Sequence, residues 1–146
     1  MSDETTIRTE IRTRLAACLA TVLSPDAVEV DPEGDPATFP GLALFDQGDR
    51  LMEREAMLER RLGDFSIEGY VQRGGGADAS AERDKLHADA VAAIMVDDTL
   101  GNLVELIEPG DNRKHVARFA EAGRLAFVLD LSVQFTTLRT DPARSA

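Results

Sequence analysis

The feature that most constrains the fold is a strict alternation of apolar and polar side chains near the end of the chain. The odd positions of this stretch carry large apolar residues: Leu125, Phe127, Leu129, Leu131, Val133 and Phe135. The even positions are polar from Asp130 to Thr136. Because neighbouring side chains on a strand point to opposite faces, the pattern predicts one long strand with an apolar face towards a core. Its other face meets water or a partner.

Length and composition predict one domain with an aliphatic core. The chain has 146 residues, of which 43% are hydrophobic and 5% aromatic. Such a chain buries a core without disulfides or metals, so residues 1–146 are expected to form a single domain. The lone Cys18 lies in an apolar helical pattern, which predicts a buried small hydrophobic residue. We expect neither a signal peptide nor a membrane span, and therefore a protein made in the cytosol.

The charge balance argues against two classes of partner. The formal net charge is −11, from 16 basic and 27 acidic residues. General nucleic-acid binders need a basic face, and docking on an anionic membrane needs basic residues as well. An acidic chain can still line a channel through which DNA slides without being gripped.

The first half of the chain predicts one helix followed by strands. Apolar residues at helical spacing indicate an amphipathic helix over 4–23, which ends before Pro25. A short strand is expected at 27–30, a proline-rich loop after it, and a buried strand at 41–45 that closes in a turn at 46–50.

Residues 51–62 allow two interpretations. Their composition favours helix, because Leu, Met, Glu, Ala and Arg are good helix formers. The clear strand pattern of 64–73, however, needs a partner, and the strand at 41–45 lies just upstream. A hairpin or long bent strand is therefore favoured, with the helix kept as the alternative.

The second half predicts a flexible glycine-rich turn and then helices. A helix is expected over 80–95, with a shorter helical segment over 97–107 that is broken at 108–112. A short strand or irregular turn at 114–123 then leads into the long final strand. The fold class that follows is α+β, a mainly antiparallel sheet packed on one face by two or three α-helices.

The residues show no catalytic constellation. The stretch RGGGADAS lacks the lysine and hydroxyl of a phosphate loop, and Asp97 and Asp98 are more typical of charges at a helix N-terminus than of a metal site. His87 and His115 are too few for a zinc site without distant ligands. We therefore expect no enzyme activity, no cofactor and no metal.

The order of features as a whole resembles the tail terminator proteins of long-tailed, siphovirus-like phages and phage-like gene transfer agents. The resemblance covers residues 5–142 and rests on IRTEIRTRLAACLATVL, FPGLALFDQGD, FSIEGYVQ, LHADAVAAIMVDDTLGNLVELIE and GRLAFVLDLSVQFTTLRTDP. It has no single motif that aligns residue by residue. The stretch EREAMLERR is the hardest part to match.

The resemblance implies a structural virion protein without catalytic activity. Such proteins form a homo-hexameric ring that caps the head-proximal end of the tail tube, stops its polymerisation and joins the tail to the neck. The implied partners are further copies of the chain, the tail tube protein, and a stopper or head-completion protein. Genomic DNA would pass through the ring unbound, and no membrane is involved. The implied location is the virion tail or neck, and the host cytoplasm during assembly.

The candidate interface residues lie in the charged stretch after the second strand and at the RTDP exit of the last strand. A projecting hairpin there would offer paired charges to a neighbouring subunit or to the tube. The candidates are Arg50, Arg54, Glu55, Arg60, Arg61, Arg139 and Asp141.

Two alternatives remain open at this point. One is another head–tail joining protein, such as a neck stopper or tail completion protein. The other is a small α+β ligand-binding domain or enzyme, which would have to use Cys18, His87 or His115 as its reactive groups.

Overall fold

The computed structural model describes residues 6–34, 36, 38–72, 77–114 and 124–145. Within them, two helices pack on a six-stranded sheet whose order is β1-β2-β3-β5-β4, with β6 paired to β5. All strand pairs are antiparallel except β1 with β2. The predicted α+β class is therefore confirmed. The elements are α1 (Ile7–Leu19), a 3₁₀ turn (Pro25–Ala27), β1 (Val28–Val30), β2 (Gly41–Arg54), β3 (Leu58–Gln72), α2 (Ala77–Met95), β4 (Leu106–Lys114), β5 (Arg124–Leu138) and β6 (Asp141–Ser145).

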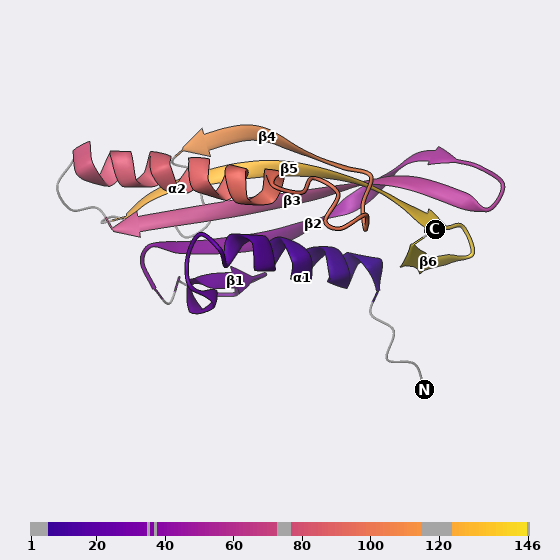
Figure 1. Cartoon of the computed structure of the whole chain (residues 1–146), viewed down its shortest axis with the longest axis horizontal. Coiled ribbons are helices and arrows are strands. Elements are labelled where there is room, and N and C mark those ends of the chain that lie inside the picture. Colours follow the sequence, from indigo (N-terminus) through magenta and orange to yellow (C-terminus); the bar gives the residue numbers. More distant parts are fainter. Residues whose placement is uncertain (1–5, 35, 37, 73–76, 115–123, 146) are drawn as a thin grey trace.

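Both helices cover the same face of the sheet (Figure 1), and the main core lies between the helices and that face. The side chain of Thr6 caps α1 by accepting a hydrogen bond from the Thr9 N–H at 3.2 Å. The helix buries one residue per turn along its inner face: Ile7, Ile11, Leu15 and Leu19. All six apolar odd positions of β5 belong to this core, so the predicted inward face of the last strand is confirmed.

A glycine makes room for one of the aromatic rings of this core. Gly69 on β3 lies directly opposite Phe127 on β5. A Cβ atom at position 69 would lie 2.0 Å from Cε2 of Phe127, far inside contact distance. The ring therefore fills the space that a side chain at position 69 would occupy. Strands β3 and β5 pair without a break from Leu58 to Gln72.

The helix predicted over 97–107 is wrong. Residues 96–105 form turns, and β4 begins at Leu106. The backbone enters the left-handed region at three successive residues, with φ of 50°, 70° and 67° at Leu100, Gly101 and Asn102. The carboxylate of Asp97 accepts the Gly101 N–H at 2.7 Å, which closes this turn.

Two predicted turns are in fact bulges within strands. Residues 46–50 continue β2, and the register shift between Asp46 and Asp49 accommodates Gly48, whose φ is 96°. Residues 108–112, predicted as a break, lie inside β4 with a register shift between Pro109 and Asn112. The strand or turn predicted for 114–123 falls mostly outside the described residues, apart from Lys114 at the end of β4.

The opposite face of the sheet, called the open face below, carries a smaller apolar cluster that the sequence did not predict. Its members are Ala43, Phe45, Tyr70, Ala126 and Val128, with Phe39 packed against them. The buried Tyr70 hydroxyl donates to the carboxylate of Glu68. Within the described residues, no helix is long and apolar enough to cross a membrane.

Candidate functional site: a projecting hairpin arm

Residues 46–62 of β2 and β3 form a hairpin that we call the arm. It runs past the ends of both helices to one tip of the elongated molecule (Figure 1). The hairpin predicted over 51–62 is thus confirmed, and the alternative helix is not. Strand β5 supports the arm as far as the pair of Leu58 with Leu138. Beyond that pair, the Arg139 N–H donates to the carbonyl oxygen of Met57 at 2.8 Å, which fixes the turn at the tip.

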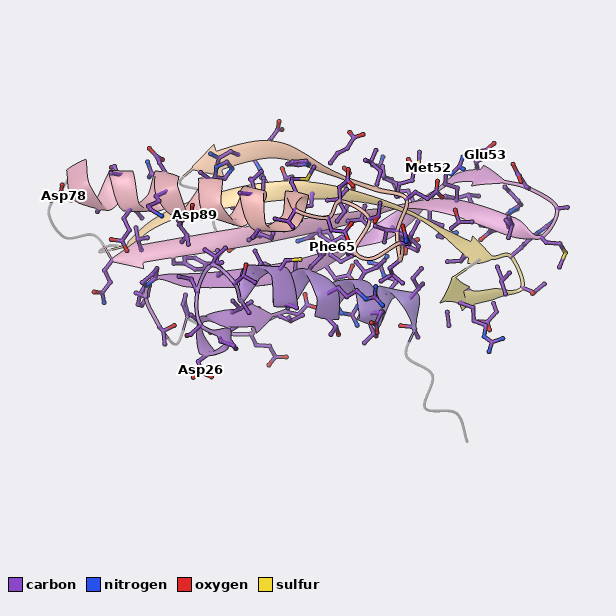
Figure 2. All side chains as sticks on the ribbon, in the orientation of Figure 1. Asp26, Met52, Glu53, Phe65, Asp78 and Asp89 are labelled. Carbon is purple, nitrogen blue, oxygen red and sulfur yellow. The ribbon has the colours of Figure 1, made fainter. Side chains whose placement is uncertain are left out.

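The main core ends where the arm begins. Phe65 and Phe135 are its last large side chains on the helix side, and Figure 2 places Phe65 close to α1. Gly63 lies between their rings, since a Cβ there would come within 2.9 Å of Phe65 and 3.3 Å of Phe135. The guanidinium of Arg8 covers both rings, with its carbon 5.4 Å and 5.9 Å from their centroids.

From this point a row of ion pairs replaces apolar packing on the helix side of the arm. We call this row the ladder. Arg12 donates to Asp46 at 2.8 Å, and Arg8 bridges Asp46 and Asp49. Arg61 then bridges Asp49 and Glu59, and Arg54 ends the row on Glu59 at 2.8 Å. The ladder therefore joins α1 to both strands of the arm and fixes the direction in which the arm projects.

The carboxylates of the ladder are shielded from solvent. The side chains of Asp46, Asp49 and Glu59 are only 12%, 16% and 11% exposed. Burial alone would raise the pKa of Asp46. Hydrogen bonds from the Gly48 N–H and from its two arginines outweigh burial and hold that pKa below its usual value of 3.8. Shielded, hydrogen-bonded pairs of this kind are stronger than exposed surface pairs.

On the open face, Glu105 joins the turn before β4 to the arm. The Thr136 hydroxyl donates to its carboxylate, and this contact is the main cause of its lowered pKa. Arg60 donates to the same carboxylate at 3.1 Å, and the Gln134 amide does so at 3.1 Å. Arg60 also pairs with Glu53 at 2.6 Å, so the contacts of Glu105 continue onto β2.

A shallow groove crosses the open face at the root of the arm. It has a volume of about 200 Å³, and its lining is Met52, Leu62, Leu106, Glu108, Ser132 and Gln134. Three of these six residues are apolar, and the single charged one is Glu108 on β4.

The arm carries exposed apolar side chains that the fold does not use. Leu51 is 44% exposed, Met52 50% and Met57 60%. Figure 2 shows Met52 and Glu53 on the arm, away from α1. Apolar side chains gathered on a projecting element are typical of a surface that another molecule covers.

Strand bulges limit how another chain can attach here. The outer edge of β2 is interrupted between Asp46 and Asp49 and again between Leu51 and Glu53. The outer edge of β4 is interrupted between Pro109 and Asn112. Bulges and proline disfavour pairing of an edge with a further strand. These two edges are therefore poorly suited to extension of the sheet by a further strand.

The seven candidate interface residues are all found at this end of the molecule, although most already have partners within the chain. Arg54 and Arg61 belong to the ladder, Arg60 pairs with Glu53 and Glu105, and Arg50 pairs loosely with Asp64 at 3.4 Å.

The remaining three candidates lie at or beside the tip. The Glu55 N–H donates to the Leu58 carbonyl across the turn, and the Arg139 side chain donates to the Ala56 carbonyl at 3.5 Å. Asp141 accepts the Ala143 N–H at 3.1 Å at the start of β6. Their role at an interface stays a prediction.

Sequence reasoning missed the acidic half of the ladder and the apolar groove. Asp46 and Asp49 were placed in a turn, and no partner was predicted for either. The pattern of two acidic residues three apart, directly after a buried strand, was the signal that could have indicated them.

Two of the three groups that an enzyme would have to use, Cys18 and His87, lie within the described residues. The pKa of the Cys18 thiol is raised by burial and by the nearby charge of Asp97, which disfavours the reactive thiolate. His87 packs edge-on against Phe127, with ring centroids 5.2 Å apart, and His115 lies outside the described residues. Among the described residues, no three His, Cys, Asp or Glu side chains could share a metal ion.

Comparisons with known proteins find similarity only to solved structures. No protein-family model and no curated protein sequence matches the chain. One similar structure is titled as the virion of a native gene transfer agent particle. The two chains are 13% identical, the match covers 88% of this chain and 90% of that one, and the TM-score is 0.43. A second solved structure is 19% identical, with 88% and 94% covered and a TM-score of 0.44.

Proposed function

We propose that the protein is a structural component of a phage-like particle, a tail terminator whose copies close into a ring on the head-proximal end of the tail tube. The sequence resemblance supports this role, and the arm is the observation of the structure that carries it. The arm is a projection that ion pairs hold in place, and it carries exposed apolar side chains. The charged candidate interface residues lie at the same end of the molecule. The two similar structures are too distant to carry an argument for this role.

The arm suits assembly of like subunits because its surface differs from the rest of the molecule. A ring needs a heterologous interface, in which one patch of each subunit contacts a different patch of the next. A projecting arm supplies the first patch, and the ladder keeps its direction constant from copy to copy. A constant direction is what a ring requires, since an arm that swings would give open chains of variable curvature.

No step of chemistry enters this proposal. Each copy contributes contacts to its neighbours and to the tube end, and the tail stops growing because the ring covers the surface on which tube subunits add. The ring joins the tail to the neck through its other face, and DNA passes through its centre.

The test is to add purified protein to growing tail tubes of the same particle and to image the tube ends. Tubes capped at one end by a ring, with growth stopped, are expected. A matched variant replaces residues 51–61 by an Asn-Gly turn between Arg50 and Leu62, which lie opposite each other in the hairpin. This variant should stay folded and fail to cap. Uncapped tubes with the unaltered protein would contradict the proposal.

A further inference from the structure

Two of the three exposed large apolar side chains on the arm are thioethers. Met52 is 50% exposed and Met57 is 60% exposed, and Leu51, at 44%, is the third. The other methionines of the chain are Met1, which falls outside the described residues, and Met95, which is 38% exposed at the end of α2. Oxidation of methionine therefore changes the apolar surface of the arm more than that of any other described element.

Both side chains are open to a small oxidant and are not needed by the core. Met57 lies in the turn at the tip of the arm, and its backbone carbonyl, not its side chain, holds that turn to Arg139. Met52 lies in the bulge of β2 that follows Leu51, and it lines the shallow groove. Figure 2 shows Met52 on the side of the arm away from α1. Neither methionine belongs to a core cluster, so a sulfoxide on either leaves the packing of the fold intact.

The reaction is a two-electron transfer of oxygen from a peroxide. A lone pair of the thioether sulfur attacks one peroxide oxygen, and the O–O bond breaks. The second oxygen leaves as hydroxide and takes the proton of the transferred oxygen, which gives water and a sulfoxide. The sulfur is oxidised and the peroxide is reduced. The product carries a polar S=O group in place of an apolar sulfur, and methionine sulfoxide reductases restore the thioether.

We propose that Met52 and Met57 are oxidation sites that control whether the arm binds the next copy of the chain. This inference rests on the proposed function, in which the arm is one of the two patches that join neighbouring copies in the ring. With both thioethers reduced, the arm offers an apolar surface to that neighbour. With both oxidised, the same contact has to bury two polar sulfoxides, and binding weakens about tenfold or more. Assembly is thereby favoured under reducing conditions.

Treatment with hydrogen peroxide, followed by peptide mass spectrometry, tests the chemical part of the proposal. The protein carries Cys18→Ala, so that the thiol consumes no oxidant. In the free protein, sulfoxide should form faster at Met57 and Met52 than at Met95, which is the order of their exposed fractions. A rate at Met95 as high as that at either methionine of the arm would overturn the assignment.

The same measurement on capped tubes needs no variant of the arm. A neighbour that covers the arm should slow oxidation at Met52 and Met57 relative to Met95. A ratio of rates equal to that of the free protein would show that the arm stays uncovered in the assembly, and it would overturn the control of binding by oxidation.

The capping assay measures that control directly. Peroxide-treated protein should need about ten times the concentration of untreated protein to cap the same share of tubes. The double variant Met52→Leu, Met57→Leu keeps apolar side chains of similar volume, and its capping should not change on treatment. The matched control, Met95→Leu, should remain as sensitive to peroxide as the unaltered protein.

The outcomes separate this inference from the proposed function. Equal sensitivity of the double variant and of Met95→Leu would refute a role of the arm methionines. Sulfoxides on the arm together with undiminished capping would overturn the inference and leave the ring standing. Absence of capping by the untreated protein would contradict the proposed function and overturn the inference with it.

Discussion

Replacing Asp49 by asparagine removes one carboxylate from the ladder while leaving the size of the side chain almost unchanged. In the native protein this carboxylate accepts hydrogen bonds from Arg8 and Arg61, and it is only 16% exposed. The ladder then holds four arginines against two carboxylates instead of three. We expect the arm to lose its fixed attachment to α1.

The expected cost follows from the two bonds. A hydrogen bond to a charged group contributes about 1.5–3 kcal/mol to stability, and the amide oxygen of asparagine retains part of one of them. The free energy of unfolding should therefore fall by about 2 kcal/mol. With a urea dependence of about 2 kcal/mol per M, the unfolding midpoint should move down by about 1 M.

The matched control is Asp64→Asn. Asp64 also pairs with an arginine of the arm, Arg50, but at 3.4 Å and with side chains 42% and 65% exposed. Exposed pairs contribute about 0.2–1 kcal/mol, so its midpoint should move little. Amide hydrogen exchange should also be faster along the arm of the Asp49 variant and unchanged in the rest of β3. Equal midpoints for the two variants would refute the shielding argument for the ladder.

Three further predictions concern the core and the ladder. Gly69→Ala should destabilise the protein by about 2 kcal/mol or more, because its Cβ would overlap the ring of Phe127, and thermal unfolding measures this. Thr137→Val should leave stability unchanged or raise it by up to about 1 kcal/mol, because the buried Thr137 hydroxyl has no hydrogen-bond partner within the described residues. Acid should destabilise the protein below about pH 4, because the pKa of Asp46 is lowered on folding. Its contribution is full above the unfolded value of 3.8 and is lost as the pH falls through the folded value.

Each of these predictions has its own control. Gly34→Ala should be neutral, because no atom lies within 4 Å of the added Cβ, and a cost equal to that of Gly69→Ala would argue against steric overlap. Thr136→Val removes the hydroxyl that donates to Glu105 and should cost about 1 kcal/mol, the opposite of the change at the next residue. Asp46→Asn should flatten the acid limb of the stability curve; an unaltered limb would place its origin elsewhere.

Local sequence patterns predicted correctly the elements that need only one apolar face packed on a core. The alternation along β5 predicted a strand with one face on a core, and all six apolar side chains of that face are buried as expected. The spacing of Leu100, Val104 and Ile107 also fits a helix, and all three are buried. No helix forms there because the backbone is left-handed at Leu100 and at the next two residues. The spacing of apolar residues carries no information about backbone handedness.

The arm shows where the sequence stops being informative. Its candidate arginines were predicted to face a partner, but Arg54, Arg60 and Arg61 are paired with acids of the same chain. Some of the pairs that hold the arm join residues far apart in the sequence. Arg8 and Asp49 are 41 residues apart, and Arg60 and Glu105 are 45 apart. Pairing over such distances depends on how α1 and β4 pack on the sheet. The groove likewise exists only because Met52, Leu62 and Leu106 come together from three strands.

The unbroken partnership of β3 and β5 has a mechanical consequence. The two strands pair at fifteen successive positions, from the end of the sheet near the start of α2 to the tip of the arm. At roughly 3.3 Å per residue, they span about 50 Å. A pull between the arm and the opposite end loads these strands in shear, so that many hydrogen bonds carry the force together. Force applied at the tip is thus spread along the whole length of the molecule, and the turn itself bears little of it.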